Sequence, residues 1–267
     1  MKTKSPKKTS ILPAKTASKP LLHPPLSEVV FEINFPRSFV VENHIADYQR
    51  QLSAMYPDSG DEFVLYVPPA VSFGKPPKSE GGGMTPVRSF VFHNSTGARV
   101  IRISVVHFSL LVSDYVDFED YKSALMAALK PAIDIFGLQR LDRVGLRYIN
   151  KIPIPKEQPL TYENYVRSPI DPNGFLPHTV SKFLTEVSVD VDKKRTLTIR
   201  SGLLPPQPDS STRIYLLDLD CSSPESISLP SQDLRSLLDD FHEAIESEFK
   251  RAIVEEYWKY IAEGVPM

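Results

Sequence analysis

The sequence has a single cysteine, Cys221, among its 267 residues. No disulfide can form within the chain, which excludes the disulfide-rich framework of small secreted proteins. No apolar run is long enough to cross a membrane as a helix. The first residues are basic but lack the apolar core of a secretory signal. We therefore expect a cytoplasmic protein without a membrane span.

The common catalytic and metal-binding motifs are also missing. The sequence contains no Gly-rich phosphate loop followed by a helix and no G-x-S-x-G turn. The six histidines are scattered, and no two have the spacing of metal ligands. Cys221 lacks a neighbouring histidine that could activate it. We therefore predict no catalytic residue, no metal and no cofactor, and we favour a non-catalytic protein over an enzyme.

The charge of the chain is unevenly distributed. The net charge is −2, but residues 1–20 carry six lysines and no acidic residue, so the remainder carries about −8. The composition of this segment predicts a disordered basic tail, either a nucleic-acid-binding arm or, as we favour, a solvated tail. An acidic body disfavours nucleic-acid binding, because phosphate contacts require clustered Lys and Arg. The tail lysines are Lys2, Lys4, Lys7, Lys8, Lys15 and Lys19.

The composition of the rest is globular, since hydrophobic residues make up 41% and supply a sizeable core. Alternating apolar residues at 28–35 predict a half-buried strand, followed by a helix over 43–56 with Asn43 as its N-cap. Residues 74–86 are rich in Gly and Pro and predict a loop. His107 lies in an apolar strand pattern, which favours a buried core histidine.

Two further helices are predicted from their apolar stripes and end signals. Asp117 is an N-cap candidate with Asp120 three residues later, and Gly137 fits the C-terminal stop of that helix. Pro131 within this stretch predicts a kink or an earlier end. Residues 231–261 have apolar residues at helical spacing throughout and predict one long helix.

The order of predicted elements is similar in residues 21–137 and 138–267. Each part has a strand, a helical or irregular segment, several antiparallel strands and a helix, which indicates a possible internal duplication. We predict an α+β protein with a large, twisted, mostly antiparallel sheet, long helices on one face and both parts joined in one sheet. This topology resembles TATA-box-binding-protein-like folds or a helix-grip arrangement.

The first strands of the two parts carry opposite charges at matching positions. EVVFEINF at 28–35 has Glu28 and Glu32 where RVGLRYIN at 143–150 has Arg143 and Arg147. If the strands pair antiparallel with Glu28 opposite Arg147, then Glu32 lies opposite Arg143. Each such pair contributes about 0.2–1 kcal/mol. The arginines are then structural, which we favour over a binding site.

A binding surface on the polar face of the sheet remains the alternative. A mixed-charge face suits a protein, a peptide or a small polar ligand better than DNA. Its carboxylates could also bind a divalent cation or, as we favour for them, be solvated. The candidate residues are Glu28, Glu32, Arg143, Arg147, Asn150, Asp218 and Asp220.

The segments PPLSEVVFEINF at 24–35 and RVGLRYIN at 143–150 resemble those of a sporadically distributed, uncharacterised bacterial family of about this length. The strand containing Asp218 and Asp220 is similar to that family too. The resemblance implies a bacterial cytoplasmic protein, and the sporadic distribution is typical of accessory genes for defence or toxin–antitoxin systems. The resemblance carries over no activity. From the missing catalytic motifs and the mixed-charge sheet face, we predict an interaction module with a protein partner. The alternatives are a small-ligand or nucleotide-binding enzyme that uses the polar face, and a nucleic-acid binder that uses the tail.

Overall fold

The computed structural model describes six stretches of the chain, and the fold below refers to them. The predicted basic tail, residues 1–20, lies outside the described residues, as do residues 74–84 of the predicted loop. The described residues are 21–66, 85–156, 162–168, 180–206, 210–229 and 233–267.

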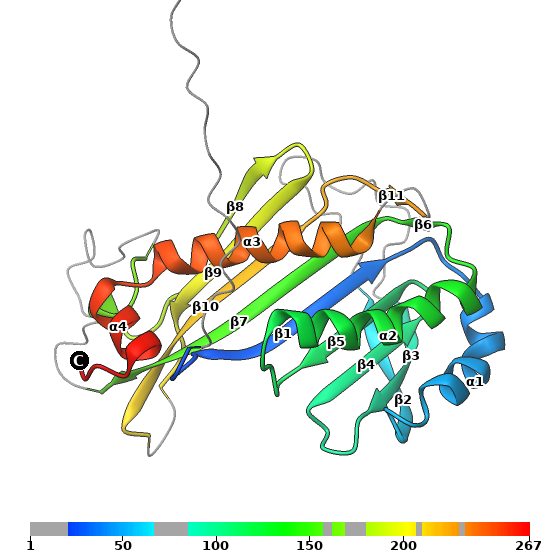
Figure 1. The fold of residues 1–267 in the computed structure, drawn as a ribbon, viewed down its shortest axis with the longest axis horizontal. Coiled ribbons are helices and arrows are strands. Elements are labelled where there is room, and N and C mark those ends of the chain that lie inside the picture. The colour runs from blue at the N-terminus through cyan, green and yellow to red at the C-terminus, as the bar shows by residue number, and fades with distance from the viewer. Residues whose placement is uncertain (1–20, 67–84, 157–161, 169–179, 207–209, 230–232) are drawn as a thin grey trace, which may run out of the picture.

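The first part of the chain forms five strands and two helices among the described residues. A strand and a helix come first, four strands follow, and a second helix ends the part, as Figure 1 shows. The elements in chain order are β1 (Leu26–Asn34), α1 (Val40–Leu52), β2 (Asp58–Tyr66), β3 (Thr85–His93), β4 (Arg99–Ser104), β5 (His107–Val112) and α2 (Phe118–Phe136).

The second part repeats this order with fewer strands in its meander. A short 3-10 turn, η1, takes the place that α1 has in the first part. The elements are β6 (Arg140–Leu141), β7 (Arg143–Pro155), η1 (Tyr162–Asn164), β8 (Thr185–Asp192), β9 (Arg195–Leu203), β10 (Thr212–Ser222), β11 (Ile227–Ser228), α3 (Leu234–Ala252) and α4 (Glu255–Glu263).

One nine-stranded antiparallel sheet connects the two parts of the described chain. Its strand order is β2-β3-β4-β5-β1-β7-β10-β9-β8, with the first strands of the two parts, β1 and β7, paired at its centre. On each side the chain runs to the far edge and returns by a meander of hairpins. Apart from the number of strands, which is four beyond β1 and three beyond β7, this order is the same on both sides, as the duplication hypothesis predicts. The predicted α+β class with a large antiparallel sheet is therefore confirmed.

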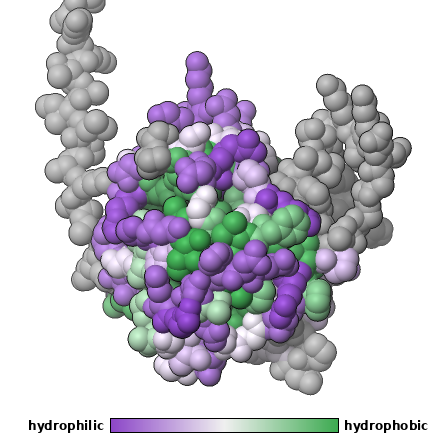
Figure 2. Space-filling view, turned by 90° about the vertical axis from the view of Figure 1, so that its right-hand side faces the viewer, coloured by the Kyte–Doolittle hydropathy of each residue, from purple (hydrophilic) through white to green (hydrophobic). Residues whose placement is uncertain are grey.

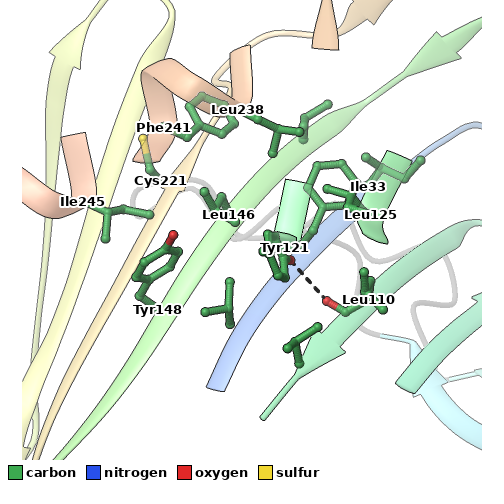
Figure 3. Packing of buried hydrophobic residues seen from close by; sticks show 14 of the residues in the cluster. Ile33, Leu110, Tyr121, Leu125, Leu146, Tyr148, Cys221, Leu238, Phe241 and Ile245 are labelled. Carbon is green, nitrogen blue, oxygen red and sulfur yellow. Dashed lines mark hydrogen bonds between the residues drawn. The ribbon is translucent and has the colours of Figure 1, made fainter. Parts of the chain in front are cut away.

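The helices lie on one face of the sheet and bury its apolar side chains. Figure 1 shows α2 and α3 in front of the strands, and α3 contacts β7, β9 and β10. Figure 3 shows Phe241 of α3 above Leu146 of β7, and Leu125 of α2 beside Ile33 of β1. All four are fully buried. Each such side chain contributes about 1.5–3 kcal/mol relative to an exposed one.

The ends of α2 are fixed by local sequence signals, as predicted. Asp117 has an extended backbone and its side chain accepts a hydrogen bond from the backbone N–H of Asp120. Gly137 has a φ of 62°, a left-handed conformation that glycine adopts without strain, and its N–H bonds to the carbonyl of Ile133. Pro131 does not end the helix, which continues to Phe136.

Replacement of Asp117 by alanine is expected to lower the free energy of unfolding by about 1 kcal/mol, because the N–H of Asp120 then loses its partner. Asp117→Asn is the matched control, since the amide oxygen also accepts this bond. Denaturant unfolding of both variants measures the effect. An equal loss in the two variants contradicts a capping role.

Two helix predictions are wrong in their bounds. The first helix begins at Val40, and its N-cap position is Phe39 and not Asn43. The last helix is not continuous, because Ile253 and Val254 have extended backbones between α3 and α4. Ile253 there forms a β-bridge with Val166, whose segment lies far away in the sequence. The tertiary contact therefore interrupts a helical pattern that the sequence carries unbroken.

The predicted pairing of β1 with β7 is confirmed, but the predicted register is wrong by two residues. Val30 lies opposite Arg147, and Glu32 lies opposite Gly145. A shift of two residues keeps every side chain on the same face of the sheet. The apolar alternation therefore could not distinguish the two registers, and the partners of the arginines must be sought elsewhere.

The surface near α1 combines apolar and polar side chains. Figure 2 shows this side of the molecule, which lies at the right of Figure 1, with an apolar patch among hydrophilic residues. Phe39 is exposed at the start of α1. Among the described residues, no helix combines the length and the apolar character needed to span a bilayer.

Candidate functional site

The polar face of the sheet lies opposite α2 and α3. Along β7, alternate residues such as Val144 and Leu146 are buried toward the helices. Arg143, Gly145 and Arg147 occupy the other set of positions, because successive side chains of a strand point to opposite faces. The central strands β1, β7, β10 and β9 therefore place their polar residues side by side on one surface.

Arg147 is held by a buried carboxylate on β10. Its Nε donates to Oδ1 of Asp218 and its Nη2 donates to Oδ2, both at 2.7 Å. The side chain of Asp218 is only 1% exposed, whereas that of Arg147 is 40% exposed. The hydrogen bonds to Asp218 raise the pKa of Arg147. This two-point contact fixes the plane of the guanidinium group.

Arg143 lies along its own strand above Gly145. Its Nη2 donates to both carboxylate oxygens of Asp220 at 2.9 Å, and its Nη1 lies 3.4 Å from Oε1 of Glu32. A Cβ atom at Gly145 would be 2.6 Å from that Nη1. The glycine between the two arginines therefore provides the space in which Arg143 links β1 to β10.

Arg200 on β9 is a member of this cluster that sequence reasoning missed. Its Nε donates to Glu186 of β8 at 2.6 Å, and its Nη1 lies 3.6 Å from Oδ2 of Asp218. The same Nη1 is 4.0 Å from Asp220. Arg200 pairs with Asp218 in the β9–β10 ladder. Its position on the polar face of the predicted hairpin is the feature of the sequence that indicates it.

Glu32 connects the cluster to His107 on β5. The Nε2 atom of His107 lies 3.6 Å from Oε2 of Glu32. Burial opposes ionisation of Glu32, but His107, Arg143 and Arg147 outweigh it and lower the pKa of this carboxyl group. The prediction of a core histidine is therefore wrong, because His107 is half-buried on the polar face beside an acidic partner.

These side chains line a pocket of about 440 Å³ at the centre of the polar face. Val30 and Gly145 contribute its uncharged surface. Its charged lining consists of Glu32, Arg143, Arg147, Arg200 and Asp220. Burial raises the pKa of Asp220, and the neighbouring arginines counteract this only in part. The lining thus combines three arginines with two carboxylates at fixed positions.

The structure brings together most of the predicted candidate residues, but not all. Asn150 lies on the helix-facing side of β7, where its Nδ2 donates to the carbonyl of Leu217 at 3.0 Å. Glu28 lies farther along β1 and pairs with Lys151 at 3.1 Å. The tail lysines lie outside the described residues. The cluster therefore consists of Glu32, Arg143, Arg147, Arg200, Asp218 and Asp220.

The chemistry open to these groups is limited by their ion pairs. Each charged side chain of the lining has an oppositely charged partner within 4.0 Å. Within the described stretches, no group of three or more His, Cys, Asp or Glu side chains could hold a metal ion. Burial raises the pKa of the Cys221 thiol to about 12, so the thiol stays protonated at neutral pH. The cluster is suited to recognition through fixed charges.

Comparison with known proteins gives no further assignment. No protein-family model matches the chain, and no curated protein matches it.

Proposed function

We propose that the protein is a non-catalytic interaction module that recognises a protein partner through the pocket on the polar face of its sheet. The observation that carries the proposal is the set of ion pairs around this pocket. Asp218 and Asp220 hold Arg147 and Arg143 in fixed orientations. Recognition by groups that are already held in place loses less conformational entropy on binding.

A protein partner agrees better with the charge of this surface than nucleic acid does. The lining contains both signs of charge in nearly equal number. Phosphate backbones bind surfaces on which Lys and Arg are clustered without such compensation. The chain beyond residue 20 is also acidic overall. A partner segment that carries charged and polar groups matches a mixed surface of this kind.

The assignment to a cytoplasmic bacterial accessory system, such as a defence or toxin–antitoxin module, rests on a different argument. It comes from the resemblance of the segments at 24–35 and 143–150 to those of a sporadically distributed family. Identification of the captured partner tests this part of the proposal. A partner encoded beside a toxin or a defence nuclease supports it, whereas a housekeeping partner from an unrelated locus contradicts it.

A bulky residue at Val30 is expected to abolish partner capture. Val30 lines the pocket, so Val30→Trp fills it without removing an ion pair. Val189→Trp is the matched control, because Val189 is an exposed strand residue on β8 and pairs with the core residue Leu197. Tagged native protein and both variants are incubated with a lysate of the encoding organism, and the captured proteins are identified.

The native protein and Val189→Trp are expected to capture the same partner, and Val30→Trp is expected to lose it at least tenfold. Thermal unfolding of the three proteins checks that the folds are equivalent. Capture of the same partner by Val30→Trp would place the binding surface elsewhere and overturn the proposal.

A further inference from the structure

We propose that the pocket binds one carboxylate group of the partner, held between Arg147 and Arg200. This inference rests on the proposed function and specifies the chemical group that is recognised. Its basis is the arrangement of the two guanidinium groups around a single buried oxygen atom.

The guanidinium groups of Arg147 and Arg200 converge on Oδ2 of Asp218. Nη2 of Arg147 lies 2.7 Å from this oxygen, and Nη1 of Arg200 lies 3.6 Å from it. Both guanidinium groups therefore lie beside the same carboxylate oxygen, and both line the same pocket. The two arginines come from different strands, β7 and β9, so only the assembled sheet creates this pair.

Each guanidinium keeps donors for a ligand. Arg147 uses Nε and Nη2 for Asp218, and Arg200 uses Nε for Glu186. Among the described residues, no group accepts a hydrogen bond from Nη1 of Arg147 or from Nη2 of Arg200. Both side chains line the pocket and are partly exposed, Arg147 by 40% and Arg200 by 30%. Their remaining donors are therefore accessible from the pocket.

The buried carboxylate of Asp218 orients the guanidinium group of Arg147 for contact with a ligand. Asp218 is almost inaccessible to solvent and contacts the edge of Arg147 that contains Nε. A ligand then meets the opposite edge of a guanidinium that is already fixed. A planar carboxylate matches the parallel N–H bonds of such an edge, and this geometry is a reason why arginine recognises carboxylates.

The charge balance of the pocket favours an anion with a single charge. Three arginines and two carboxylates line the pocket, and Asp218 lies beneath them, so the charges of the cluster balance and leave no excess for a multiply charged anion. Glu32 and Asp220 would repel an incoming phosphate, which carries more negative charge than a carboxylate. A carboxylate carries less negative charge and meets less repulsion from the same two residues. The recognised group is therefore the carboxylate of an acidic side chain or of a chain end.

Titration of the full chain with small probes tests this inference through the NMR signals of the arginine guanidinium groups. N-acetylglutamate amide presents a side-chain carboxylate, and N-acetylglycine presents a terminal one. N-acetylglutamine amide is the uncharged control, and inorganic phosphate tests the other class of anion. We expect at least one carboxylate probe to shift the signals of Arg147 and Arg200 and the glutamine analogue to leave them unchanged. The probe that binds more tightly shows whether the partner presents an acidic side chain or a chain end.

Arg200→Lys keeps the positive charge but loses the planar fork, and is expected to weaken carboxylate binding about tenfold. Arg88→Lys is its matched control, because Arg88 pairs with Asp61 at 2.8 Å on strands away from the pocket. Equal shifts with the glutamine analogue, shifts with phosphate alone, or equal affinity of the two variants would overturn the inference. Loss of partner capture in Val30→Trp together with silent carboxylate probes would refute the carboxylate and leave the proposed function standing.

Discussion

Replacement of Arg147 by alanine is expected to lower the free energy of unfolding by about 3 kcal/mol, the low end of the range for breaking a buried ion pair. The variant leaves Asp218 charged, almost fully buried and without its two-point partner. Arg200 at 3.6 Å and the partial exposure of Arg147 keep the loss at the low end. Denaturant unfolding of the native and variant proteins measures the difference.

The control for this prediction is Arg88→Ala, because the pair of Arg88 with Asp61 has both side chains almost half exposed. Arg88→Ala is expected to lower the free energy of unfolding by less than about 1 kcal/mol, as is usual for surface ion pairs. The double variant Arg147→Met, Asp218→Leu replaces both charges by apolar groups and is expected to recover most of the loss. If Arg147→Ala costs no more than Arg88→Ala, the contact with Asp218 does not stabilise the fold.

Replacement of Gly202 by alanine is expected to lower the free energy of unfolding by about 3 kcal/mol, the upper part of the usual range for overpacking. Gly202 lies in β9, and a Cβ atom there would be 2.1 Å from the carbonyl oxygen of Phe183 and 2.8 Å from Cα of Leu184. Both are backbone atoms, which cannot move aside as the end of a side chain can. The backbone bond from Phe183 to Leu203 holds the two segments together.

Gly60→Ala is the matched control for Gly202→Ala. Gly60 is also a strand glycine, in β2, but no atom lies within 4 Å of the position of its missing Cβ. This substitution is expected to leave stability unchanged or to raise it by up to about 1 kcal/mol, since alanine restricts the unfolded chain more than glycine does. Thermal or denaturant unfolding of both variants gives the comparison. Similar behaviour of the two would contradict the close approach of Phe183 to Gly202.

The polar face of the sheet was predicted in part from the sequence. The alternation of apolar residues in 28–35 and 143–150 was sufficient to predict two strands and to assign Glu32, Arg143 and Arg147 to the polar face. That the two strands are neighbours was inferred from the similar order of elements in the two parts. Asp218 and Asp220 were also assigned to a polar strand face. The pairing of the arginines with these aspartates on β10 was not predicted, because nothing local distinguishes one cross-strand neighbour from another.

His107 illustrates a second limit of the sequence pattern. Its neighbours Val106 and Phe108 are buried, so the run of residues resembles a core strand. The backbone alternation nevertheless directs His107 to the polar face, where it lies opposite Asn34 of β1 and diagonally across from Glu32, 3.6 Å from its carboxylate. Arg200 was missed for a related reason, since its importance comes from Asp218 on the neighbouring strand.

The sequence by itself determined the class of fold, the polar face for Glu32, Arg143 and Arg147, and the ends of α2. These features depend on backbone geometry and on residues within one turn or one strand, such as Asp117 and Gly137. The tertiary structure decided the two-residue register of β1 on β7, the break between α3 and α4, and the partners of Arg143 and Arg147. Each of these depends on contacts between segments far apart in the chain. A shift of two residues conserves the local pattern, so only packing of the whole sheet selects one register.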